Sequence, residues 1–233
     1  MSTSASNPNF ERLALAAQKL APLLDRIAFV GGCVTGFLLT DPAAAEVRPT
    51  LDVDAIIAIA SYAEFTHLEN TLRGLGFRQF PVGGSPICRW KSDDLILDLM
   101  PTDSSILGFG NLWYGPTLEN SEKINVGGLE IRVVSAPYFI ATKLEAFHGR
   151  GKGDFRMSHD REDMVTVVDG RSELVDEVRA SQRDLQDYLR RQFRALLLNR
   201  DFLEALPGHL LPDAASQQRL HLVVGRMQKL VEK

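Results

Sequence analysis

Two aspartates at the start of an apolar segment constrain the fold of this chain more than any other feature. Asp52 and Asp54 are separated by one residue and precede an uninterrupted run of alanine and isoleucine at residues 55–60. Such a run, without polar alternation, is typical of a strand buried on both faces of a sheet. Residues two apart on a strand point to the same face, so both carboxylates would meet at one point. We interpret the pair as ligands of a divalent metal ion, Mg2+ or Mn2+, because such ions prefer carboxylate oxygens.

A third acid interrupts another apolar segment further along the chain. Asp98 is the one charged residue within residues 95–100, which otherwise predict a strand. A buried carboxylate without a partner is costly, so we expect a metal ion or a cationic partner beside it. We predict Asp98 as the third metal ligand. A salt-bridged or helix-capping aspartate at a strand end is the alternative.

Two consecutive glycines mark a candidate phosphate site. Gly31 and Gly32 follow a predicted strand at residues 27–30 and precede a predicted helix at residues 34–39. Bare backbone can approach an anion closely, and its N–H groups can bind phosphate oxygens. A tight turn would explain a glycine pair equally well. The acid pair some twenty residues later favours the phosphate interpretation.

The composition limits the classes of function. The chain has 233 residues, of which 45% are apolar and 24% charged, enough for one large domain or a core with an appendage. Its formal net charge of -4 argues against general binding of polyanions. No segment approaches the roughly 20 apolar residues that span a bilayer, so we expect a cytoplasmic protein without a membrane partner. Cys33 and Cys88 are far apart and are expected to be buried side chains rather than zinc ligands or a disulfide.

The periodicity of apolar residues predicts an α/β (α+β) fold with a mixed sheet. Helices are expected at residues 10–27, broken near Pro22, and at residues 62–75 and 137–147; further strands are expected at residues 77–82, 87–91, 95–100 and 129–134. After residue 170 the pattern becomes helical throughout. We therefore divide the chain into a core at residues 1–170 and a C-terminal helical part at residues 171–233. The charges of the helical part indicate a solvated face or, alternatively, a basic groove around Arg190, Arg191, Arg194 and Arg200.

The chain resembles the DNA polymerase beta-type nucleotidyltransferase superfamily. The resemblance lies in six residues: Gly31, Gly32, Thr50, Asp52, Asp54 and Asp98. Two later segments, at residues 141–147 and 158–163, resemble the third and fourth motifs of AbiEii/AbiGii-type nucleotidyltransferases. Some members of that family are toxins of bacterial toxin-antitoxin systems. The similarity covers roughly residues 25 to 170. It implies a nucleotidyltransferase fold with a mixed sheet flanked by helices, and a nucleotide-binding role for Thr50 beside the two glycines.

The resemblance also implies an active-site role for three residues of the later motifs. Lys143 matches the lysine of the third motif, and Asp160 or Asp163 matches the aspartate of the fourth. From the residues alone, Lys143 would balance the charge of a triphosphate or simply extend along the surface. Asp160 and Asp163 are three apart on a predicted helix capped by Ser158, so they share a face. They would orient Lys143 or the acceptor, or would only complement the helix dipole.

Together these features predict Mg2+-dependent transfer of a nucleoside monophosphate from an NTP to an acceptor hydroxyl, with release of pyrophosphate. Asp52 and Asp54 would bind metal, and Asp98 would complete the site and help to deprotonate the acceptor. In a toxin the acceptor would be tRNA or a protein hydroxyl, and a cognate antitoxin would be the partner. The alternatives are transfer to a small aminoglycoside-like molecule and a non-catalytic nucleotide-binding module. Three acids argue against the second alternative, because binding alone does not require them.

Overall fold

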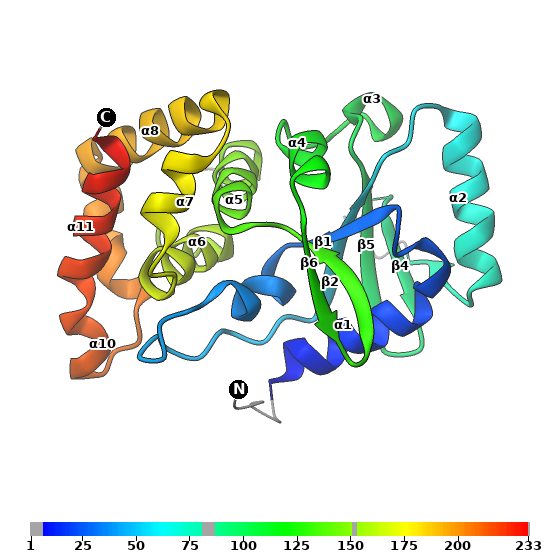
Figure 1. The fold of residues 1–233 in the computed structure, drawn as a ribbon, viewed down its shortest axis with the longest axis horizontal. Coiled ribbons are helices and arrows are strands. Elements are labelled where there is room, and N and C mark those ends of the chain that lie inside the picture. The colour runs from blue at the N-terminus through cyan, green and yellow to red at the C-terminus, as the bar shows by residue number, and fades with distance from the viewer. Residues whose placement is uncertain (1–6, 81–86, 151–152, 233) are drawn as a thin grey trace. The chain divides into compact units, whose positions relative to one another are not determined.

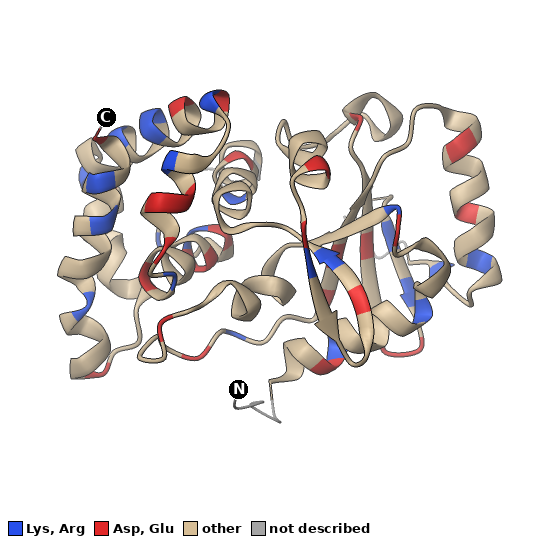
Figure 2. Cartoon of the chain, in the orientation of Figure 1, with Lys and Arg blue, Asp and Glu red and all other residues tan. Residues whose placement is uncertain are grey.

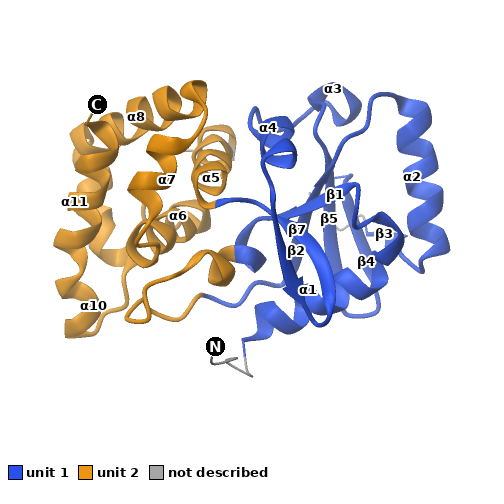
Figure 3. Ribbon diagram, viewed as in Figure 1, with its two compact units in different colours: residues 1–34, 48–135 blue, residues 35–47, 136–233 orange. Residues whose placement is uncertain are grey.

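The computed structural model describes residues 7–80, 87–150 and 153–232 (Figure 1). The chain forms two compact units (Figure 3): unit 1 comprises residues 1–34 and 48–135, and unit 2 comprises residues 35–47 and 136–233. This division differs from the boundary at residue 170 that we predicted. The helices at residues 136–150 and 159–170 pack with the C-terminal helices. Apolar periodicity reveals that a helix is buried on one side but not which elements cover it, so the sequence pattern could not assign them.

A seven-stranded sheet organises unit 1, with the strand order β3-β4-β5-β2-β1-β7-β6. β2 is parallel to β5 and β1 is parallel to β7, whereas the other neighbouring pairs are antiparallel. The predicted mixed sheet of an α/β fold is therefore confirmed. The strands are β1 (Ile27–Val30), β2 (Asp52–Ile57), β3 (Arg78–Gln79), β4 (Arg89–Ser92), β5 (Leu95–Pro101), β6 (Glu122–Val126) and β7 (Leu129–Val133).

Most of the predicted strands agree with the structure. β1 has the predicted bounds, and β4, β5 and β7 agree within two residues. The predicted strand at residues 77–82 corresponds to β3, and its part beyond residue 80 lies outside the described residues. β6 was not predicted. It is an edge strand whose residues from Glu122 to Asn125 are mostly exposed, so it lacks the apolar pattern of a buried strand.

Two helices of unit 1 cover one face of this sheet. The Nζ of Lys19 in α1 donates to Ser92 Oγ at 3.0 Å, and the guanidinium of Arg73 in α2 lies 5.6 Å from the centre of the Trp90 ring. Both helices therefore lie on the Ser92 and Trp90 side of β4. The helical elements of the unit are α1 (Pro8–Lys19), η1 (Ala21–Leu23), α2 (Tyr62–Gly74), α3 (Ser104–Leu107) and α4 (Tyr114–Glu119).

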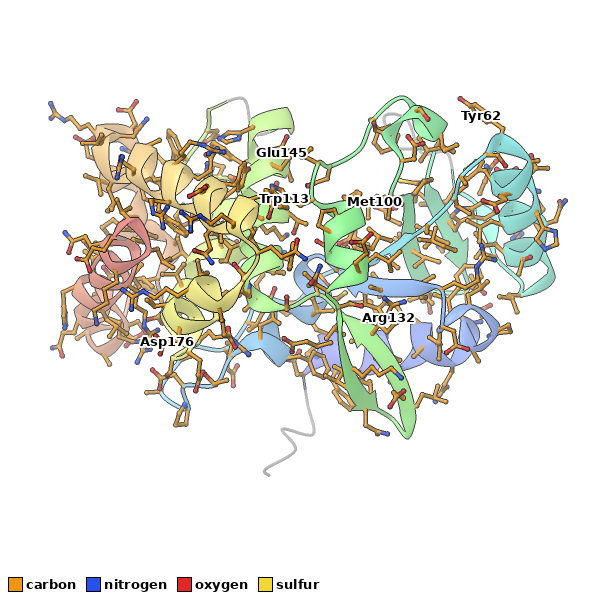
Figure 4. The ribbon with its side chains drawn as sticks, turned by 45° about the horizontal axis from the view of Figure 1, so that its top comes forward. Tyr62, Met100, Trp113, Arg132, Glu145 and Asp176 are labelled. Carbon is orange, nitrogen blue, oxygen red and sulfur yellow. The ribbon has the colours of Figure 1, made fainter. Side chains whose placement is uncertain are left out.

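The other face of the sheet carries α4. The hydroxyl of Tyr114 lies 3.1 Å from the sulfur of Met100, which is labelled in Figure 4. Met100 is two residues after Asp98 on β5, so both side chains are on this face. The acids of β2 and β5 therefore lie on the side of the sheet opposite α1 and α2.

Unit 2 is built from helices: α5 (Ala136–Arg150), α6 (His159–Gly170), α7 (Leu174–Ala180), α8 (Arg183–Leu198), α9 (Arg200–Ala205), η3 (Leu206–His209), α10 (Ala214–Gln218) and α11 (Leu220–Val231). Unit 2 also includes the segment at residues 35–47, which contains most of η2 (Gly32–Leu38). The guanidinium of Arg219 binds Asp41 at 2.7 Å and Asp169 at 2.8 Å. The backbone N–H groups of Thr40 and Asp41 both donate to the carbonyl of Gly170 at 2.9 Å. These contacts fix the segment to α6 and α11.

The structure also describes the predicted cap at Ser158 and the two cysteines. Ser158 caps α6, where its hydroxyl accepts a hydrogen bond from the N–H of Arg161. Both cysteines are buried and neither forms a disulfide, and burial raises the pKa of the Cys88 thiol to about 12. Among the described residues, no helix has the length and apolar character needed to cross a membrane.

Candidate active site

The strand register brings the three predicted acids together. Asp54 of β2 is paired with Asp98 of the parallel strand β5, and Asp52 is two residues earlier on β2. Because alternate residues of a strand share a face, all three carboxylates lie on one side of the sheet. On the neighbouring strands β2 and β5, these acidic residues lie beside basic residues of β4 (Figure 2). The prediction that β2 is buried on both faces holds from Ala55 to Ile57, whereas Asp52 and Asp54 are half-buried.

An arginine that we did not single out in the sequence joins two of the acids. Arg89 of β4 is paired in the sheet with Asp98. Its Nε donates to Asp98 Oδ1 at 2.8 Å, and one terminal nitrogen donates to Asp98 Oδ2 at 2.6 Å and to Asp52 Oδ2 at 2.8 Å. The hydrogen bonds that Arg89 donates to Asp98 raise the pKa of Arg89 above its already high ordinary value. The cationic partner that we expected beside Asp98 is therefore Arg89.

The chemistry of the donors fits a hard divalent cation, since three carboxylates face one side of two adjacent strands. Their present arrangement is different from a metal cluster. Within residues 7–80, 87–150 and 153–232, no three acidic, histidine or cysteine side chains are grouped so that they could hold a metal ion. In this arrangement the Arg89 guanidinium is hydrogen-bonded to both oxygens of Asp98 and to one of Asp52.

Gly31 allows the backbone after β1 to approach Asp54. Its φ is +73°, a conformation that glycine adopts at little cost. A Cβ at this position would lie 1.9 Å from Asp54 Oδ2, so any side chain would collide with the carboxylate. Gly31 of the predicted glycine pair therefore lies directly beside Asp54. Gly32 begins η2, and the N–H of Val34 donates to the carbonyl of Gly31 at 3.4 Å.

Residues of α1 hold the segment that leads into β2, which the sequence did not indicate. The side-chain oxygen of Asn9 accepts from the N–H of Thr50 at 2.8 Å, and its nitrogen donates to the carbonyl of Arg48 at 3.0 Å. Arg12 donates to the carbonyl of Thr50. Thr50 itself is buried, and its hydroxyl donates to the carbonyl of Asp52 at 3.2 Å. In this structure Thr50 therefore positions the backbone of the first acid.

The three residues of the later motifs form a second ionic cluster, within unit 2. The Nζ of Lys143 lies 2.6 Å from Asp163 Oδ2 and 3.3 Å from Asp160 Oδ1. All three residues are buried, so Lys143 does not extend along the surface and the two aspartates do more than complement a helix dipole. Asp160 and Asp163 share a face of α6, as predicted, and both hold the ammonium of Lys143 from α5.

Comparison with known proteins supports the class of fold. The chain is similar to the crystal structure of an antigenic nucleotidyltransferase-like protein from Paracoccidioides brasiliensis, with a TM-score of 0.51 and 20% sequence identity over 87% of this chain and 94% of that chain. No protein-family model and no curated protein matches the sequence. The protein therefore has a nucleotidyltransferase-like α/β fold.

Proposed function

We propose that this protein is a Mg2+-dependent nucleotidyltransferase that moves a nucleoside monophosphate from an NTP to an acceptor hydroxyl. One observation carries the proposal: Asp52, Asp54 and Asp98 face the same side of two adjacent parallel strands, in a fold similar to that of a nucleotidyltransferase-like protein. Acids on neighbouring strands are suited to a reaction in which charge develops on a triphosphate. A structural ion pair alone would need only Arg89 and one carboxylate.

The proposed reaction assigns a task to each acid. Asp52, Asp54 and Asp98 would hold Mg2+ or Mn2+, which would neutralise the triphosphate and lower the pKa of the attacking hydroxyl when bound. The acceptor oxygen attacks the α-phosphorus, and the bond to the bridging oxygen of pyrophosphate breaks with its electron pair. The proton of the acceptor goes to a carboxylate, for which we propose Asp98. This step requires that an oxygen of Asp98 leave Arg89.

The glycine turn supports the same proposal. Because Gly31 has no side chain, its backbone lies against the Asp54 carboxylate. A triphosphate held by the acids would meet backbone N–H groups there rather than a side chain. We propose that Gly31 and Gly32 contact triphosphate oxygens, with Thr50 fixing the entry to β2. The catalytic roles of Lys143, Asp160 and Asp163 stay a prediction.

The acceptor is the finer part of the proposal. We propose a macromolecular hydroxyl, on tRNA or a protein, as expected for a toxin with a cognate antitoxin. The exposed guanidinium groups of Arg191 and Arg194 on α8 support an RNA acceptor. The other two arginines of the predicted basic groove are partly neutralised, since Arg190 pairs with Asp187 and Arg200 with Glu204.

Label transfer tests this function. Each of the four NTPs, labelled at the α-phosphate, is incubated with Mg2+, the protein and total cellular tRNA, cellular protein or an aminoglycoside. We expect label on one macromolecular fraction, and a loss of at least about 100-fold in the Asp52→Asn/Asp54→Asn variant. Asp94→Asn, in the exposed turn between β4 and β5, is the control and should leave transfer unchanged. Label on the aminoglycoside alone would favour the small-molecule alternative, and no transfer from any NTP to any acceptor would contradict the proposal.

A further inference from the structure

The strand register places Arg89 where its side chain contacts the acids. It lies on β4, directly opposite Asp98 on β5, and the neighbouring Trp90 points to the buried face. Side chains alternate along a strand, so Arg89 points to the face of the acids. Lys91 has the same orientation two residues later. The sheet itself therefore presents a guanidinium to the carboxylates, without any loop rearrangement.

The contacts of Arg89 have the geometry of a strong ion pair. Two of its nitrogens meet the two oxygens of Asp98 at 2.8 and 2.6 Å, which is the two-pronged arrangement that a planar guanidinium favours. The terminal nitrogen also reaches Asp52 at 2.8 Å. Three of the six oxygens of the proposed metal ligands are thus hydrogen-bonded to one cation.

A metal ion and Arg89 would compete for these oxygens. A divalent cation needs the carboxylate lone pairs at about 2.0 to 2.1 Å, and a guanidinium held against the same oxygens would repel it at close range. The side chain of Arg89 is partly accessible to solvent, so it can leave the acids without crossing the core of unit 1.

We propose that Arg89 is the resident counter-cation of the acid cluster, and that a divalent metal ion binds there only by displacing its guanidinium from Asp98. This inference rests on the proposed function, because it takes the three acids to be the metal ligands. In the absence of a metal, Arg89 bridges the carboxylates of Asp98 and Asp52. The native protein therefore binds free metal weakly, and removal of Arg89 strengthens that binding.

Electron paramagnetic resonance of free Mn2+ measures this competition without any need for turnover. The full-length protein is titrated with Mn2+ alone, as wild type and as the Arg89→Gln, Arg89→Lys and Lys91→Gln variants. We expect Arg89→Gln to bind Mn2+ at least about tenfold more tightly than wild type, because a charge-assisted pair no longer has to be broken. Arg89→Lys keeps the charge without the two-pronged contact and should be intermediate. Lys91→Gln, on the same strand and face, should behave as wild type.

A second substitution locates the ion. Adding Asp54→Asn to Arg89→Gln should remove the gain, because Asp54 is paired with Asp98 and would supply a ligand oxygen. If Arg89→Gln does not fold, as judged by circular dichroism, Arg89→Lys carries the test, and it must bind Mn2+ measurably more tightly than wild type.

The outcomes separate this inference from the proposed function. Equal Mn2+ affinity in wild type and in the Arg89 variants would overturn the role of Arg89, while label transfer from NTP could still be present. Weak binding that Asp54→Asn does not change would overturn both, because the acids would then not be metal ligands. A gain of affinity in Arg89→Gln that is lost with Asp54→Asn would support the inference even if the acceptor has not been found.

Discussion

The two units each contain one cation held between two aspartates, but the two clusters differ in their exposure. In unit 1 the side chains of Arg89, Asp52 and Asp98 are 24%, 34% and 9% exposed. In unit 2 those of Lys143, Asp160 and Asp163 are 11%, 9% and 4% exposed. Strand register builds the first cluster, and three-residue spacing on a helix builds the second. A partly exposed ion pair can exchange its partners, whereas a buried one is held by the cost of leaving a charge alone in the interior.

This comparison assigns different consequences to the two clusters. Breaking the cluster of unit 2 should mainly reduce stability, because all three of its charged residues are buried. Breaking the cluster of unit 1 should mainly change what the acids bind, because solvent can replace the lost partner.

The largest effect is expected for Lys143→Met. The substitution leaves Asp160 and Asp163 buried without their cation, so the free energy of unfolding should fall by about 3–5 kcal/mol. Urea unfolding followed by circular dichroism measures the change. The control is Lys123→Met, which removes an exposed pair with Glu130 and should leave the free energy of unfolding nearly unchanged. Equal decreases in the free energy of unfolding in the two variants would show that burial does not determine how much these ion pairs contribute to stability.

A glycine substitution tests how closely the turn of unit 1 approaches the acids. Gly31→Ala adds a Cβ that would collide with Asp54 and also carries the strain of a positive φ. Gly128→Ala carries the same kind of strain at φ +86°, with no atom within 4 Å of the added Cβ. We expect the free energy of unfolding to fall by about 2–3 kcal/mol for Gly31→Ala and by about 1 kcal/mol for Gly128→Ala. If thermal unfolding gives equal losses, the backbone does not lie against Asp54.

Removal of Arg89 should cost less than removal of Lys143. Arg89→Gln breaks the pairs with Asp98 and Asp52. Although Asp98 is buried, Asp52 and Arg89 itself are partly exposed, so water can replace the guanidinium, and we expect the free energy of unfolding to fall by about 1–2 kcal/mol. The same urea titration applies. A loss as large as that of Lys143→Met would mean that the unit 1 cluster is a structural element and would remove the distinction between the two regions.

The smallest effect concerns a neutral group in unit 2. Burial lowers the pKa of His209 below its usual 6.5, and its Nε2 lies 2.6 Å from the carbonyl oxygen of Phe155. The unfolded chain takes up a proton near pH 6.5 and the folded chain only at lower pH, so stability falls as the pH decreases through 6.5 toward the folded pKa. The free energy of unfolding should fall by less than about 1.4 kcal/mol per pH unit. Unfolding midpoints from pH 7.5 to 5 should fall less in His209→Gln, and identical pH profiles would contradict this prediction.

The sequence predicted the elements with strong apolar patterns, and it predicted which acids would meet. The bounds of β1 and the Ser158 cap were predicted correctly because each follows from a local pattern. The pairing of Asp54 with Asp98 could be anticipated because both acids interrupt buried strands, where an isolated charge needs a partner.

Other features depend on contacts that no local pattern encodes. The role of Arg89 follows from the register of β4 against β5, and its sequence neighbours Cys88 and Trp90 give no indication of it. Asn9 and Arg12 are forty residues away from the segment that they hold. A polar edge strand such as β6 has no buried side to produce a pattern.

We expect the acid face of unit 1 to bind a nucleotide, and calorimetry with a non-hydrolysable NTP measures this binding. The four α,β-methylene NTP analogues are titrated with Mg2+ into wild type and into the Asp52→Asn/Asp54→Asn variant. We expect at least one analogue to bind wild type with a dissociation constant below about 1 mM and to lose at least about tenfold in affinity in the variant. Absence of binding to the folded wild type, or equal affinity in the variant, would contradict the claim.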